Sequence, residues 1–290
     1  MLRLQMAVEK AQRMRAAAAG PAGAPADPSE AARPAEADTP GPARFRPVAR
    51  PGRDAPDPEA APWRVLVALD PDPALLRRNR VVTLAGGPSA APWDLLRVRL
   101  LDEARRHGWR RIALSSARSG VGRSTASANL ALSLARAPDI RGLALDLDLG
   151  NPGLGRLFGQ TPVTGMATGL AEVLAGQSPF AAVARRLGAR FAFGFAGPPI
   201  GEPADLLAAR SAGQALAGIE ADYAPDLILF DAPSLASGPA GYAALRLADA
   251  AILLAEAERS TIAEIDRAER TLAGITNVLG TVIVKARHGA

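Results

Sequence analysis

The chain has 290 residues, of which 48% are hydrophobic and 22% are charged, so its composition allows one domain with a buried core plus a tail. It contains no cysteine, which excludes disulfide bonds and thiolate metal sites. The formal net charge is +5, and the only lysines are Lys10 and Lys285. A basic balance suits an anionic partner such as nucleotide, membrane lipid or nucleic acid, and it equally suits a solvated surface without a partner.

The first segment, residues 1–61, is predicted to be a disordered arm rich in Ala, Pro and Arg. It has almost no large apolar side chains after its first turns, so it cannot bury enough surface to offset its ordering entropy. No apolar run in the chain reaches the roughly 18–20 residues that a membrane span needs. The start of the chain is interrupted by charge, which is not typical of a signal peptide. Membrane contact would therefore be peripheral or made through a partner.

The second segment, residues 62–290, is predicted to form one domain with its core at 110–285. Short apolar segments alternate with helical ones, which indicates an α/β three-layer fold with a mostly parallel sheet between helices. The expected strands are 111–115, 142–147, 190–195, 227–230, 250–254 and 278–284. The expected helices are 93–107, 124–135, 169–175, 180–187, 203–220 and 261–272. Ligands of such sheets bind beyond the carboxyl ends of the strands.

The central motif is the sequence Ser-Ser-Ala-Arg-Ser-Gly-Val-Gly-Arg-Ser-Thr at 115–125. It follows a predicted strand and opens a predicted helix, which is the context that a phosphate-binding P-loop requires. Gly120 and Gly122 let the backbone bend, so that its amides and the positive end of the helix can surround phosphate oxygens. The predicted nucleotide-binding residues are Ser119, Gly120, Val121, Gly122, Arg123, Ser124 and Thr125.

Two residues depart from the usual P-loop pattern. Ala117 stands where the motif has its first glycine, and Arg123 stands where it has its lysine. Arginine keeps the charge, but its planar guanidinium is wider than an ammonium, so it would reach phosphates in a different geometry or block part of the pocket. The alternative interpretation is an ordinary strand–helix turn rich in small residues.

Acidic residues follow two of the predicted strands. Asp146 and Asp148 lie at the end of one strand, and Asp231 lies at the end of another. Since the carboxyl ends of parallel strands share one edge of the sheet, all three side chains should lie beside the loop. A lone Asp after a strand is usually a helix cap or a turn residue. Three of them beside one phosphate loop favour a site for Mg²⁺ and for an attacking nucleophile.

The motifs between Arg111 and Val284 resemble those of the bacterial tyrosine kinases of capsule and exopolysaccharide synthesis, and they follow one another in the same order as in that family. That family belongs to the deviant P-loop ATPases, which include partition and division-site proteins. Besides the loop, the segments that carry the resemblance are 145–152 (Leu-Asp-Leu-Asp-Leu-Gly-Asn-Pro), 169–176, 193–203 and 226–233. Upstream, residues 93–100 resemble the family's oligomer-forming helix, with Arg97 matching its second arginine.

The resemblance implies an ATP-binding, tyrosine-kinase-like protein that uses ATP and Mg²⁺. It implies catalytic roles for Asp148, Asp146 and Asp231, with Asp148 assisting deprotonation of an attacking hydroxyl. It implies that Ser124, Asp146 and Asp231 bind the metal. It also implies a membrane polysaccharide co-polymerase as adaptor, homo-oligomerisation, and a cytoplasmic protein held at the inner face of the plasma membrane through that adaptor.

Several departures from the family favour impaired catalysis. The phosphate-binding lysine is replaced by Arg123, and the family's C-terminal tyrosine cluster is missing, since the only tyrosines are Tyr223 and Tyr242. One alternative is a partition-type ATPase, with Arg118 at the position of that group's dimer-bridging lysine and basic side chains on membrane or DNA. For those basic side chains we favour a solvated helix face over nucleic acid binding. Another alternative is a non-catalytic scaffold that keeps only the fold.

Overall fold

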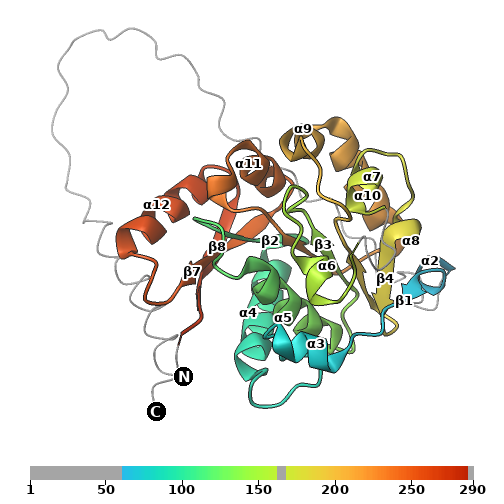
Figure 1. The fold of residues 1–290 in the computed structure, drawn as a ribbon, viewed down its shortest axis with the longest axis horizontal. Coiled ribbons are helices and arrows are strands. Elements are labelled where there is room, and N and C mark those ends of the chain that lie inside the picture. The colour runs from blue at the N-terminus through green and yellow to red at the C-terminus, as the bar shows by residue number, and fades with distance from the viewer. Residues whose placement is uncertain (1–60, 162–167, 287–290) are drawn as a thin grey trace, which may run out of the picture. The chain divides into compact units, whose positions relative to one another are not determined.

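The computed structural model describes residues 61–161 and 168–286, so the predicted N-terminal arm lies almost entirely outside the described residues. The described part contains an eight-stranded sheet with the strand order β1-β4-β5-β3-β6-β2-β7-β8 (Figure 1). Neighbouring strands are parallel except β4 and β5, which are antiparallel. The predicted α/β three-layer fold with a mostly parallel sheet is therefore confirmed.

All six predicted strands are present. They are β2 (Arg111–Ser116), β3 (Gly142–Asp146), β5 (Phe191–Gly194), β6 (Leu227–Asp231), β7 (Ala250–Glu256) and β8 (Asn277–Val284). Two strands were not predicted, β1 (Val67–Ala68) and β4 (Ala184–Leu187). The helix expected over 180–187 is wrong in its second half, because α8 (Phe180–Val183) stops there. The following residues form a hairpin with β5 through Gly188 (φ 64°), a long-range pairing that local helix propensity does not show.

Four of the expected helices are confirmed with small shifts of their ends. They are α4 (Ala91–His107), α5 (Arg123–Ala135), α7 (Leu170–Leu174) and α12 (Ile262–Ala273). The helix expected over 203–220 is instead two, α9 (Pro203–Ala208) and α10 (Arg210–Tyr223), because Ala209 is extended between them (φ −66°, ψ 149°). The unpredicted helices are α2 (Ala61–Arg64), α3 (Pro73–Arg78), α6 (Leu154–Leu157), the 3-10 helix η2 (Leu235–Ser237) and α11 (Pro239–Arg246).

Helices cover both faces of the sheet (Figure 1). On one face, α4 and α5 contribute Leu100 and Leu130 to a buried cluster. On the other, α10, α11 and α12 contribute Leu216, Leu245 and Leu272 to a second cluster. Strands β3, β6 and β7 are buried along their whole length, as expected of a sheet enclosed between two helical layers.

The topology brings the predicted site together at one edge of the sheet. Strands β3, β6 and β2 are neighbours, and their carboxyl ends lie at the same edge. Asp146 of β3 is in register with Asp231 of β6, and β2 runs directly into the phosphate loop. Within the part of the chain that the structure describes, no helix has both the length and the apolar content needed to cross a membrane.

Candidate functional site

The loop between β2 and α5 has the backbone conformation of an anion-binding turn. Gly120 (φ 80°) and Gly122 (φ 107°) both lie in the left-handed region that L side chains rarely adopt. Gly122 is the N-cap of α5 and makes no side-chain cap, so the first amides of this helix are available to a ligand. Ser119 contacts the hydroxyl of Ser234 at 3.2 Å. The predicted binding residues Ser119, Gly120, Val121, Gly122, Arg123, Ser124 and Thr125 all lie in this loop or in the first turn of α5.

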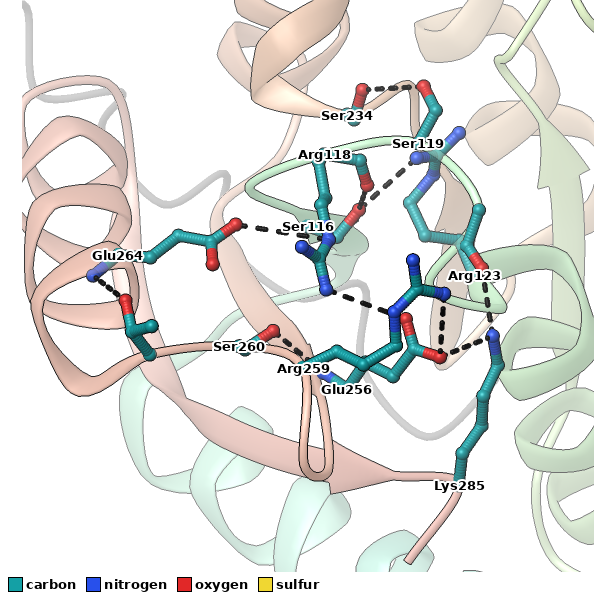
Figure 2. A network of polar contacts seen from close by, with 12 residues as sticks. Ser116, Arg118, Ser119, Arg123, Ser234, Glu256, Arg259, Ser260, Glu264 and Lys285 are labelled. Atoms are coloured by element: carbon teal, nitrogen blue, oxygen red, sulfur yellow. Dashed lines mark hydrogen bonds and ion pairs between the residues drawn. The ribbon is translucent and has the colours of Figure 1, made fainter.

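Arg123, in the position of the P-loop lysine, is bound inside the site. Its side chain is only 7% exposed, and Nη2 donates to Oδ2 of Asp148 at 2.6 Å. Nη1 donates to the hydroxyl of Ser116 at 3.2 Å (Figure 2). Nε is buried and has no hydrogen-bond partner. The guanidinium therefore spans the base of the loop and one catalytic candidate, and one of its donors is left for an anion.

Asp231 lies beside the start of α5. Oδ1 accepts a hydrogen bond from Ser127 at 3.0 Å, whereas Oδ2 is buried with no partner. Burial raises the pKa of Asp231 from 3.8 to about 6, although the nearby Ser124 hydroxyl, the charge of Arg123 and the hydrogen bond from Ser127 act in the opposite direction. This carboxylate is thus poorly compensated, as expected of a residue that needs a further cation.

Asp146 is held by the backbone. Its two oxygens accept hydrogen bonds from the amide of Asp148 at 3.2 Å and from the amide of Leu154 at 3.0 Å. Burial and the charge of Asp231 nevertheless raise the pKa of Asp146 well above its ordinary value of 3.8. Two buried carboxylates side by side disfavour each other's charge, and a bound cation would relieve this.

Two buried polar atoms without partners, and the carboxylates beside them, fit a site for ATP and Mg²⁺. A buried donor, Nε of Arg123, and a buried acceptor, Oδ2 of Asp231, both lack partners at the phosphate loop. An unsatisfied buried polar atom costs about 1–3 kcal/mol, so such atoms are uncommon, and a ligand that completes the site is one explanation for them. Among the described residues no three His, Cys, Asp or Glu side chains are arranged to hold a metal alone. Mg²⁺ bound with a nucleotide needs only one or two carboxylates, because phosphates and water supply the other oxygens. Ser124, Asp146 and Asp231 fit that requirement.

Several residues that shape the site were not predicted from the sequence. Ser127 binds Asp231, and Ser116 binds Arg123. Gly153 lies against Ser124, and a Cβ on this glycine would come within 2.2 Å of the Ser124 hydroxyl oxygen. Ser127 could have been found from its spacing, because it lies three residues after Ser124 and therefore on the same face of the helix. No local signal identified Gly153, since its contact depends on the path of the chain after β3.

No protein-family model matches the chain, and no curated protein sequence matches it at a significant level. Among solved structures, the tyrosine kinase domain of BceF has a TM-score of 0.56 and 24% identity, covering 67% of this chain and 76% of that one. The kinase domain of the Escherichia coli tyrosine kinase ETK has a TM-score of 0.60 and 22% identity, covering 70% and 79%. The kinase domain of VpsO has a TM-score of 0.59 and 20% identity, covering 68% and 96%. The chain therefore has the fold of these tyrosine kinase domains, which confirms the fold that its motifs predicted.

Proposed function

We propose that this chain is a nucleotide-binding, tyrosine-kinase-like protein of capsular or exopolysaccharide synthesis and export, with impaired catalysis. The observation that carries the nucleotide claim is the pair of unsatisfied buried atoms at the phosphate loop, one donor on Arg123 and one acceptor on Asp231. The order of the sequence motifs and the kinase-domain fold support the rest of the proposal.

In this proposal, different groups of the chain bind the phosphates and the metal ion. The amides from Gly120 to Thr125 and the free Nε of Arg123 bind phosphate oxygens. Ser124, Asp146 and Asp231 hold Mg²⁺, which would supply charge neutralisation at the phosphates. Arg123, Asp146 and Asp231 are buried, which strengthens the electrostatic contacts that these three side chains make.

The impaired activity follows from the position of Asp148. A family-like transfer to a hydroxyl needs a carboxylate to accept the hydroxyl proton, and Asp148 is the candidate. Its Oδ2 is held by Arg123 at 2.6 Å, and the side chain is 11% exposed. A base whose carboxylate oxygen is already bound by a buried guanidinium is less free to accept the hydroxyl proton, so we expect slow turnover.

A pocket of about 150 Å³ beside Asp146 provides a place for the hydroxyl acceptor. Its apolar walls include Pro152, Phe195 and Pro199, and its polar ones include Asn151 and Arg156. A phenol ring suits such walls, because apolar faces bind the ring while polar groups orient its hydroxyl. The pocket supports a tyrosine-type acceptor in this proposal.

Helix α4 bears on the proposed partners of the chain. Helix α4, which resembles the oligomer-forming helix, exposes Leu95 and Val98. Its Arg97 does not face outward but donates to the backbone oxygen of Ser133 on α5 at 2.6 Å. We propose that the exposed part of this helix serves assembly of copies of the chain, and that a co-polymerase adaptor holds them at the inner face of the plasma membrane. If a pull-down finds no specific binding between this protein and the cytoplasmic tail of such an adaptor, the adaptor claim is wrong.

Mg-ATP and Mg-ADP are expected to raise the melting temperature of the wild type, since a ligand far above its dissociation constant stabilises by a few kcal/mol. Arg123→Lys should show the larger shift, because it frees Asp148 and restores a slim cation. Asp231→Ala should lose the Mg²⁺-dependent part of the shift. The measurement is thermal unfolding with and without EDTA. If no nucleotide shifts any variant, the nucleotide claim is wrong and the scaffold alternative is favoured.

A further inference from the structure

Lys285, the only lysine among the described residues, contacts the phosphate loop from outside it. Its Nζ donates to the backbone oxygen of Gly120 at 2.9 Å and to Oε1 of Glu256 at 3.1 Å. Its side chain also passes Gly122, where an added Cβ would come within 3.6 Å of Cε. Lys285 follows the last strand, β8, and is 165 residues away from Gly120 in sequence. A positive φ of 59° turns the chain at this point.

The bond to Gly120 fixes the direction of a neighbouring amide. In a trans peptide the carbonyl oxygen and the following N–H point in opposite directions. A cation that holds the Gly120 oxygen on the outside of the loop therefore directs the N–H of Val121 to the other side, where phosphate oxygens bind. The positive charge also polarises this peptide, which makes the N–H a stronger donor. Gly120 flanks this peptide on one side and has a positive φ of 80°, so without such a restraint the peptide has more freedom to rotate.

Glu256 keeps the ammonium in place. This carboxylate is only 7% exposed, ends β7, and lies among Arg118, Arg259 and Lys285 (Figure 2). Hydrogen bonding from Lys285 is the main cause that lowers the pKa of Glu256. Arg118, from the loop itself, reaches Glu256 at 3.5 Å and Glu264 of α12 at 3.9 Å. The loop is therefore fastened to the β7–β8 side of the sheet at two points.

We propose that Lys285 is a positioning residue of the nucleotide site, which presets the peptide between Gly120 and Val121 so that its amide faces the phosphates. This role rests on the proposed nucleotide function. It adds to what Arg123 offers the phosphates, because Nη2 of that side chain is already bound to Asp148.

The test compares Lys285→Met, Lys285→Arg and Arg259→Met. Methionine removes the charge at similar length, and arginine keeps a donor that can reach the Gly120 oxygen. Arg259→Met is the matched control, because Arg259 binds Glu256 at 3.5 Å with a side chain that is 68% exposed. In the protein without nucleotide, hydrogen–deuterium exchange of the loop amides should become about tenfold faster in Lys285→Met, and affinity for Mg-ATP should fall about tenfold, as loss of one charge-assisted hydrogen bond predicts. Lys285→Arg should restore most of both, and Arg259→Met should change neither.

Two results would overturn the proposal: unchanged loop exchange in Lys285→Met, or an equal acceleration in Arg259→Met. Melting temperatures of all variants establish whether an effect is confined to the loop. If the wild type binds no nucleotide, the proposed function fails, and the exchange measurement alone then decides the role of Lys285.

Discussion

Replacing Arg123 by methionine is expected to lower the free energy of unfolding by about 3–5 kcal/mol, the cost of breaking a buried ion pair by removing one partner. The substitution leaves Asp148 buried without its guanidinium partner. In the wild type, Nη2 of Arg123 lies 2.6 Å from Oδ2 of Asp148. The Arg123 side chain is 7% exposed and the Asp148 side chain is 11% exposed, so water has little access to replace the lost partner. Urea unfolding at neutral pH measures the change.

Two comparisons isolate the ion pair from a general effect of losing an arginine. Arg106→Met removes an exposed pair with Glu103 and is expected to cost no more than about 0.5 kcal/mol. The double variant Arg123→Met with Asp148→Asn should recover most of the loss, because the unpaired charge is then gone. A double variant no more stable than Arg123→Met alone would show that the loss arises from packing.

Replacing Asp231 by asparagine is expected to stabilise the ligand-free protein at neutral pH by up to about 3 kcal/mol, since each unit of pKa shift corresponds to about 1.4 kcal/mol. The folded protein holds the proton of Asp231 up to a pKa of about 6, whereas the ordinary value is 3.8. Between these values the folded state binds more protons, so wild-type stability falls as the pH rises from about 4 to about 6. Asparagine does not titrate and escapes this loss.

The gain from Asp231→Asn should therefore be near zero below pH 4 and complete above pH 6. Denaturant unfolding at several pH values, with EDTA present, measures it. Saturating Mg-ATP should reverse the order, because the ionised carboxylate of the wild type then has a cation to bind. An Asp231→Asn variant that is less stable than the wild type at every pH would refute the electrostatic explanation and leave its bond with Ser127 as the main contribution.

The sequence was sufficient to place the phosphate loop and the three acids, for a physical reason. Gly120 and Gly122 mark the turn locally, and Asp146 and Asp231 follow apolar strands whose carboxyl ends must share one edge in a parallel sheet. Periodicity also located the central strands, because they are buried along their length. These features depend on residues that are close in the chain or on a rule that holds for every sheet of this type.

What the sequence did not show depends on contacts between distant segments. The antiparallel strand β4 exists because β5 offers it an edge, and no local preference of its residues requires a strand. The bond from Lys285 to Gly120 depends on the position of β8 at the end of the sheet. Motif comparison assigned Arg123 to the position of the P-loop lysine. Its partner could have been a phosphate, water or Asp148, and the packing of β3 against α5 brings it to Asp148.

The ion pair between Arg123 and Asp148 gives the site an internal counterion. A phosphate that bound the free Nε of this guanidinium would meet a cation that already has an anion, so it would compete with Asp148 for the same charge. Affinity then depends on the difference between two strong contacts, and small changes around Asp148 would shift it in either direction. Such a site is well suited to respond to an event at its acidic side, because whatever occupies Asp148 also releases Arg123.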